Sequence, residues 1–250
     1  MVFIGTAAWS IPKSMAPRFP QDGSSLHRYA RVLKGVEVNS SFYRRHRPET
    51  WKRWADSVPR HFRFAVKMPK RITHDLKLAD AEAEVDLFLG DIRLLGEKLG
   101  PILIQLPPKL AFEAAVVGAF LRHLCSAFDG RVVIEPRHQS WGSAEATALL
   151  SARNVVRVTP DPPAIAVEAT AERTGFAYFR LHGSPKIYYS SYGDKDLARY
   201  RQQLDQASPD SWCIFDNTAS GAALPNALAT LDQHRTNENA PGGRARFHCP

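Results

Sequence analysis

Short apolar runs recur along the chain, and most of them end in polar or charged residues. Eight runs have this form, at residues 2–6, 36–39, 62–67, 102–106, 132–135, 155–159, 176–181 and 212–215. Most are followed by a stretch with helical periodicity, which predicts repeated strand–helix units and a parallel sheet. Eight such units in 250 residues predict an α/β protein with a single (β/α)8 barrel of the TIM type.

Helical periodicity marks most of the crossovers, near residues 24–33, 48–58, 80–99, 114–128, 143–153, 195–207 and 222–233. The sixth crossover, between residues 159 and 176, contains several prolines and only weak periodicity. Because proline disrupts a helix interior, we expect the sixth helix to be shortened or missing. Periodicity is lost after residue 233, so we assign residues 1–233 to the barrel and residues 234–250 to a polar C-terminal tail.

Alternation within the strands predicts which polar groups share one end of the barrel. Residues i and i+2 of a strand face the same way. The rule pairs residues at the ends of five runs: Glu37 with Asn39, Arg63 with Lys67, Leu103 with Gln105, Glu135 with Arg137, and Arg180 with His182. The carboxyl ends of barrel strands converge on one mouth, where ligands bind. An alternative is that Glu37, Lys67, Glu135 and Arg180 form only a buried ion-pair network, which is costly to bury.

We predict an anion site in this mouth, with acid–base chemistry if the protein is an enzyme. The candidate catalytic residues are Glu135, His182 and Glu37. The candidate substrate-binding residues are Asn39, Tyr43, Lys67, His74, Gln105, Arg137, Arg180, Asp216 and Asn217. In this hypothesis the cations hold the anion, while a carboxylate and an imidazole exchange protons with it.

A divalent metal is the alternative at the same place. Oxygen and nitrogen ligands could come from Glu37, Glu135, Asp161, His182 and Asp216. The carboxylates already have cationic neighbours, so we predict neither a metal nor a cofactor. The sequence also lacks a Walker loop, a G-x-S-x-G elbow and an H-E-x-x-H motif.

Basic residues are concentrated after two of the strands. The formal net charge is +8, which favours an anionic partner. The two clusters are Arg44 to Arg47 and Lys67, Lys70, Arg71 and His74, with Trp9, Phe42 and Tyr43 nearby in the pattern. Interleaved basic and aromatic side chains suit a nucleotide or single-stranded nucleic acid. An ordinary solvated surface is the alternative.

Composition indicates a globular domain. Hydrophobic residues make up 44% and charged residues 23% of the chain, and no apolar run approaches the roughly 20 residues of a membrane span. The N-terminus does not resemble a signal peptide. The three cysteines, Cys125, Cys213 and Cys249, are too far apart in sequence to indicate a disulfide framework or a zinc site. We therefore expect a cytoplasmic protein without a membrane partner.

Seven ordered motifs resemble one family. They are GTAAW, VEVNSSFYR, FAVKMPKRITH, QLPP, IEPRHQSW, YFRLHG and FDNT, and they follow the motif series of the YecE-like proteins, known as domain of unknown function 72. The resemblance implies a TIM barrel in a bacterial-type cytosolic protein, and it implies no particular reaction. Asp216 stands where a second asparagine is commoner in the family, which adds a negative charge near the mouth.

Two functions of different class fit these observations. The first is an enzyme, or a relative that has lost activity, whose mouth binds a phosphorylated small molecule or a nucleic-acid fragment for hydrolysis or isomerisation. The alternative is a non-catalytic module that binds nucleic acid through the basic rim, with the barrel as a scaffold.

Overall fold

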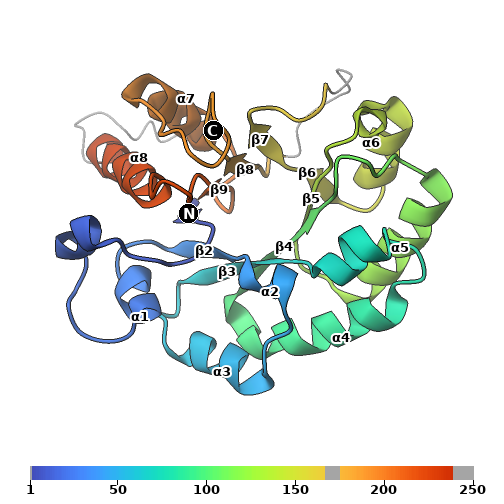
Figure 1. Ribbon diagram of the computed structural model, residues 1–250, viewed down its shortest axis with the longest axis horizontal. Helices are drawn as coiled ribbons and strands as arrows, with labels where there is room; N and C mark the ends of the chain where they lie inside the picture. The colour runs from blue at the N-terminus through green and yellow to red at the C-terminus, as the bar shows by residue number, and fades with distance from the viewer. Residues whose placement is uncertain (1, 167–174, 239–250) are drawn as a thin grey trace, which may run out of the picture.

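The protein folds into an eight-stranded parallel barrel surrounded by helices (Figure 1). The structure is a computed structural model that describes residues 2–166 and 175–238. Its strands are β1 (Phe3–Thr6), β2 (Gly35–Val38), β3 (Arg63–Lys67), β4 (Leu99–Gln105), β5 (Val132–Glu135), β6 (Val155–Arg157), β7 (Thr159–Asp161), β8 (Tyr178–Leu181) and β9 (Trp212–Phe215). All paired strands are parallel.

Two hydrogen-bonded sheets, β2-β3-β4-β5-β6 and β1-β9-β8-β7, join at both edges. At one junction, β6 and β7 are successive parts of the sixth strand, separated at Val158, whose N–H donates to the carbonyl of Ile134 at 2.8 Å. At the other, Ala7 pairs with Glu37, and the N–H of Ala8 donates to the Glu37 carbonyl at 3.0 Å. The predicted eight-stranded barrel is confirmed.

The helices lie outside the barrel (Figure 1). They are α1 (Ser25–Ala30), α2 (Ser40–Tyr43), α3 (Pro48–Asp56), α4 (Glu82–Ile92), α5 (Ala114–Ala127), α6 (Ala144–Ser151), α7 (Asp194–Gln206) and α8 (Ala223–Glu238). Local sequence sets their starts: Ser24 caps α1, Ser143 caps α6, and Pro48 occupies the first turn of α3.

One predicted helix is shorter than expected. The periodicity of residues 80–99 predicts a single helix, but α4 ends at Ile92 and a 3₁₀ segment, Arg93–Lys98, follows it. Within that segment Gly96 has φ of 56°, a left-handed conformation that interrupts a helix and suits glycine. The single helix over residues 80–99 was therefore wrong.

The sixth crossover and the C-terminal tail fall partly outside the described residues. Residues 162–166 and 175–177 contain no helix or strand, and residues 167–174 lie outside the described ranges. Helix α8 continues to Glu238, so the helical pattern extends beyond residue 233. Residues 239–250 of the predicted tail are not described. No helix in the described ranges is long and apolar enough to cross a bilayer.

The barrel interior has an aromatic floor beneath its polar mouth. Trp212 stacks between Phe3 and Tyr178, with ring centroids 4.7 and 6.0 Å away. Two glycines make room for it, because a Cβ on Gly35 or Gly100 would lie 2.9 Å from its ring. A second, larger apolar layer fills the space between strands and helices. The charged side chains of the interior are thus confined above this floor.

Candidate functional site

Arg180 lies at the centre of a buried cluster inside the barrel. Its guanidinium and the carboxylate of Glu37 are both 0% exposed. Arg180 Nε and Nη2 donate to Glu37 Oε2 and Oε1 at 3.0 and 2.8 Å. Nη1 donates to Glu135 Oε2 at 2.5 Å, and Nη2 also donates to Asp216 Oδ2 at 2.9 Å. One guanidinium therefore compensates carboxylates from β2, from β5 and from the end of β9.

Glu135 is held by further cations. Arg137 donates to Glu135 Oε1 from Nε at 3.2 Å and from Nη2 at 3.1 Å. Burial by itself would raise the pKa of Glu135, but Arg180, His182 and Arg137 together lower that pKa well below its usual range. The carboxylate consequently stays ionised at neutral pH.

His182 joins two carboxylates through its two ring nitrogens. Nδ1 lies 3.0 Å from Asp216 Oδ2, and Nε2 lies 3.2 Å from Glu135 Oε1. Burial lowers the pKa of His182, but the bonds to Asp216 and Glu135 outweigh it and raise the pKa above its ordinary value. Both nitrogens face acceptors, so this geometry favours the doubly protonated imidazolium. The ring of Tyr188 meets His182 edge-to-face, with centroids 5.7 Å apart.

Lys67 lies in the same mouth, but its ammonium contacts an aromatic ring instead of a carboxylate. Its side chain is 7% exposed, and Nζ lies 4.1 Å from the ring centroid of Phe42. Among the described residues, the ammonium makes no hydrogen bond or ion pair. Burial and the charge of Arg180 lower the pKa of Lys67 to about 8, although the nearby carboxylates oppose the shift.

Three other predicted residues lie at this end of the barrel. Gln105 is 8% exposed and pairs in register with Glu135. His74 packs edge-to-face on Phe42 at 5.0 Å, and burial together with Lys67 lowers its pKa. Asn39 follows β2, and its buried Oδ1 has no hydrogen-bond partner among the described residues.

Two predicted substrate-binding residues lie elsewhere. Tyr43, on α2, is 78% exposed and contacts the ring of Phe42. Asn217 is fully buried, and its amide donates to the Ser190 carbonyl and to Asn226 Oδ1, both at 2.9 Å. Asn217 therefore connects the loop after β8 to α8.

Two other expectations need correction. Arg63 begins β3, so it lies at the opposite end of the barrel from Lys67, where it donates to the carbonyls of Arg60 and Phe62. Asp161 pairs with Leu181 on β8, a residue of the outer layer, and accepts a hydrogen bond from Tyr200 on α7 at 2.5 Å. Residues 155 to 161 alternate without a shift, with Val156 and Val158 facing the barrel interior, so Asp161 shares the outward face of Val155 and does not join the other proposed ligands. Within the described ranges, no three His, Cys, Asp or Glu side chains are arranged to hold a metal ion.

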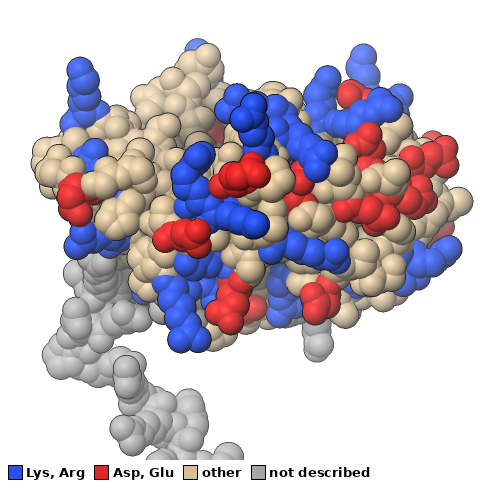
Figure 2. Space-filling model, turned by 90° about the horizontal axis from the view of Figure 1, so that it is seen from below, with Lys and Arg blue, Asp and Glu red and all other residues tan. Residues whose placement is uncertain are grey.

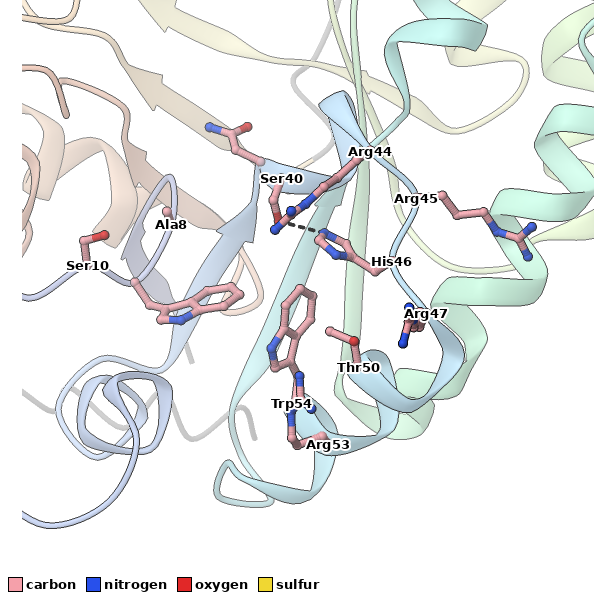
Figure 3. Close-up of a pocket in the computed structure, with 12 residues that line it drawn as sticks. Ala8, Ser10, Ser40, Arg44, Arg45, His46, Arg47, Thr50, Arg53 and Trp54 are labelled. Carbon is pink, nitrogen blue, oxygen red and sulfur yellow. Dashed lines mark hydrogen bonds between the residues drawn. The ribbon is translucent and has the colours of Figure 1, made fainter.

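A cavity of about 580 Å³ opens beside the mouth, between the loops after β1 and β2 and helix α3 (Figure 3). We call it the rim pocket. It is lined by Ala8, Trp9, Ser10, Asn39, Ser40, Arg44, Arg45, His46, Arg47, Thr50, Arg53 and Trp54. This set contains four arginines and no carboxylate. Figure 3 shows Arg45 pointing away from the pocket, and its guanidinium binds Asp91 of α4 at 2.6 and 2.9 Å.

The remaining arginines of the rim pocket are uncompensated. Arg44, Arg47 and Arg53 make no side-chain hydrogen bond or ion pair within the part of the chain that is described. His46 is bonded to Ser40 at 2.9 Å, and burial together with Arg44 lowers its pKa. The concave surface is therefore positively charged.

Sequence reasoning missed several of these residues. Trp54 has the helical spacing of a packing residue, yet it lines the rim pocket, where its ring meets Trp9 edge-to-face at 4.9 Å. Arg53 gave no signal, because an exposed helical arginine is common. Tyr178 donates to Glu37 Oε2 at 2.9 Å from below the cluster, and its i, i+2 spacing to Arg180 was the available signal.

Comparisons with known proteins give the same fold and one family. A DUF72 protein from Thermotoga maritima superimposes with a TM-score of 0.76 at 23% identity, covering 94% of this chain and 99% of that one. D-psicose 3-epimerase from Clostridium cellulolyticum H10 shares the fold alone, with a TM-score of 0.52 at 10% identity, covering 84% of this chain and 91% of that one.

Curated relatives also align with the chain. The UPF0759 protein YecE of Escherichia coli K12 is 32% identical over 165 residues, which span 64% of this chain and 59% of YecE. The UPF0759 protein YunF of Bacillus subtilis 168 is 25% identical over 93% of this chain and 94% of its own length. The model of the family "Protein of unknown function DUF72" matches residues 3–246. The chain therefore belongs to the DUF72 family.

Proposed function

We propose that this protein binds a phosphorylated small molecule at the carboxyl end of its barrel, with the phosphate in the rim pocket. The observation that carries the proposal is the charge of that pocket: four arginines and no carboxylate line it, and three of the arginines have no side-chain partner among the described residues. Guanidinium groups bind phosphate oxygens through charge-assisted, often bidentate hydrogen bonds. Asn39 Oδ1, buried and without a hydrogen-bond partner in the described part of the chain, offers an acceptor to the same ligand.

In this proposal the rest of the ligand extends from the rim pocket past Asn39 toward the mouth. Val38 of β2 pairs in register with Val66 of β3. Asn39 and Lys67 are the next residues along these neighbouring strands, whose backbones lie about 5 Å apart. Asn39 lines the rim pocket, and Lys67 faces the buried cluster. A phosphate near Arg44 would therefore leave the rest of a small molecule beside Lys67. Arg180 is not available to such a ligand, since its donors are directed at three carboxylates.

The test is ligand-induced thermal stabilisation of the full chain. Inorganic phosphate, a sugar phosphate and a mononucleotide should each raise Tm, because a ligand that binds only the folded state stabilises it by mass action. The double variant Arg44→Ala/Arg47→Ala should lose the rise. Arg60→Ala/Arg122→Ala removes the same charge from exposed side chains outside the rim pocket and should keep it. Equal responses of the two double variants would contradict the proposal.

A second candidate is binding of single-stranded nucleic acid. Trp9 and Trp54 line the same pocket as the arginines, and bases stack on aromatic rings. However, the face that carries α3 and α4 shows Asp and Glu interspersed among Lys and Arg (Figure 2), which favours a compact ligand over a long polyanion. If nucleic acid is the ligand, affinity should increase with oligonucleotide length and fall with added salt. Affinity that does not change between a mononucleotide and a ten-residue oligonucleotide would contradict this candidate.

A further inference from the structure

Lys67 differs from a lysine with a structural role. In the same chain, Lys98 is partly buried, and its ammonium donates to the carbonyls of Ala55 and Val58 at 2.6 and 2.9 Å. The Lys67 ammonium is more buried, yet within the described residues its close neighbour is the face of the Phe42 ring, and no acceptor lies within hydrogen-bond distance. Burying an ammonium without acceptors is costly. A structural role does not explain this arrangement.

We propose that Lys67 is a nucleophile that forms an imine with the carbonyl carbon of an aldehyde or ketone bound in the barrel mouth. The inference deepens the proposed function, since it rests on a ligand reaching the mouth from the rim pocket and names the substrate class as a phosphorylated carbonyl compound. Its basis is position: the amine is at the carboxyl end of β3, inside the mouth, and it makes no hydrogen bond or ion pair with any residue that the structure describes.

The chemical step is addition followed by dehydration. The neutral amine of Lys67 forms a C–N bond to the carbonyl carbon, and the carbonyl π electrons pass to oxygen, which becomes a hydroxyl as the nitrogen gives up a proton. The hydroxyl then takes up one proton from solvent and leaves as water. The nitrogen lone pair forms the C=N bond, and the product is a cationic iminium with one N–H.

The surroundings of Nζ suit that product. An iminium keeps the positive charge of the ammonium but has one N–H donor in place of three, so it loses less from the lack of acceptors. The ring of Phe42 at 4.1 Å attracts either cation. The charged groups that act on Lys67 come from several strands. Arg180 disfavours the ammonium, and three carboxylates favour it, those of Glu37, Asp216 and Glu135. The ammonium in turn lowers the pKa of His74.

The reactive form of the amine is accessible near neutral pH. Burial and Arg180 lower the pKa of Lys67 to about 8, so about a quarter of the amine is unprotonated at pH 7.5. An amine with an ordinary pKa would be unprotonated in only about one molecule in a thousand at that pH.

Reductive trapping tests the inference. Wild-type protein is incubated with glyceraldehyde 3-phosphate and sodium cyanoborohydride at pH 7.5, and each lysine is quantified by peptide mass spectrometry. Lys67 should be modified at least about tenfold faster than exposed Lys77, because about a quarter of the Lys67 amine is neutral at this pH, while Lys98 should stay unmodified. Intact Lys67→Arg protein should lose the fast phase. Modification of Lys67 no faster than Lys77, or a fast phase that persists in Lys67→Arg, would overturn the inference.

The same reagents separate this inference from the proposed function. If phosphate stabilises the protein but Lys67 is not modified preferentially, the rim pocket stands and the nucleophile does not. If Lys67 reacts equally fast with glyceraldehyde and its phosphate, and the Arg44→Ala/Arg47→Ala variant is unimpaired, the nucleophile stands and phosphate binding in the rim pocket fails.

Discussion

Arg180 and Glu37 form two hydrogen bonds, of 2.8 and 3.0 Å, and neither side chain exposes any surface. The pair lies above the aromatic floor of the barrel and below the mouth, where Glu135 and Asp216 share the same guanidinium. Both carboxylate oxygens of Glu37 already accept hydrogen bonds from Arg180, and Oε2 accepts a further one from Tyr178. This arrangement assigns Glu37 and Arg180 to the support of the mouth rather than to direct contact with a ligand.

Arg180→Met should destabilise the protein by about 3–5 kcal/mol, because it leaves buried carboxylates without their shared counter-ion. Chemical denaturation gives the free energy of unfolding. Arg137→Met is the comparison, since Arg137 contacts Glu135 alone among the carboxylates and is a quarter exposed; its loss should be smaller. A cost below about 1 kcal/mol for Arg180→Met would contradict the account of this cluster.

Lys67→Met should stabilise the protein near neutral pH. The pKa of Lys67 is about 8 in the folded protein, below the ordinary 10.5, so burying its charge costs folding free energy. Methionine has no charge and avoids this cost. The gain should reach about 3 kcal/mol at pH 7 if the whole shift is expressed. As pH rises, the amine loses its proton in the folded protein before it does so in the unfolded chain. The stability of the wild-type protein should therefore rise between pH 8 and 10.5, and the advantage of Lys67→Met over wild type should shrink. Chemical denaturation of both proteins across this pH range measures the difference in their free energies of unfolding. A Lys67→Met protein less stable than wild type at pH 7 would refute the prediction.

His182 should titrate above the ordinary histidine value, while His74 and His46 titrate below it. Bonds to Asp216 and Glu135 raise the pKa of His182, and burial lowers the other two. The raised pKa stabilises the fold fully below pH 6.5, and this contribution is lost as pH rises through the folded pKa of His182. NMR titration of the imidazole signals distinguishes the three rings. A midpoint for His182 below that of His74 would be inconsistent with the cluster.

Gly5→Ala should prevent folding or destabilise the protein by several kcal/mol. Its Cβ would lie 2.1 Å from the backbone oxygen of Gly35, on the neighbouring strand, so the strands would have to separate. Gly90→Ala is the matched control. Gly90 lies in α4 with nothing within 4 Å of the added Cβ, and alanine should stabilise the helix by about 0.5–1 kcal/mol. Thermal unfolding of both variants tests the packing; a folded Gly5→Ala protein with an unchanged Tm would refute it.

Local sequence patterns determined the architecture. Eight apolar runs with helical stretches between them were enough for the barrel, because a parallel strand that is buried on both faces requires a continuous apolar run. The same alternation placed Glu37, Glu135, Arg180 and His182 at one end, since the carboxyl ends of parallel strands meet there. Asp161 was a possible metal ligand by residue type alone; alternation from Val155 places it on the outward face of its strand, and in the fold it bonds to Tyr200 of α7.

Only the tertiary structure decided which charges are already compensated. Arg180, Arg44 and Lys67 are all cations near or beyond the carboxyl end of a strand, and nothing in the sequence separates them. In the fold Arg180 is enclosed by three carboxylates, Arg44 faces a pocket without a carboxylate, and Lys67 is buried against a ring. Pairing depends on distances between side chains from β2, β5, β8 and β9, which are up to 179 residues apart in sequence. Strand alternation fixes the direction of each side chain, but barrel closure fixes which partners lie within reach.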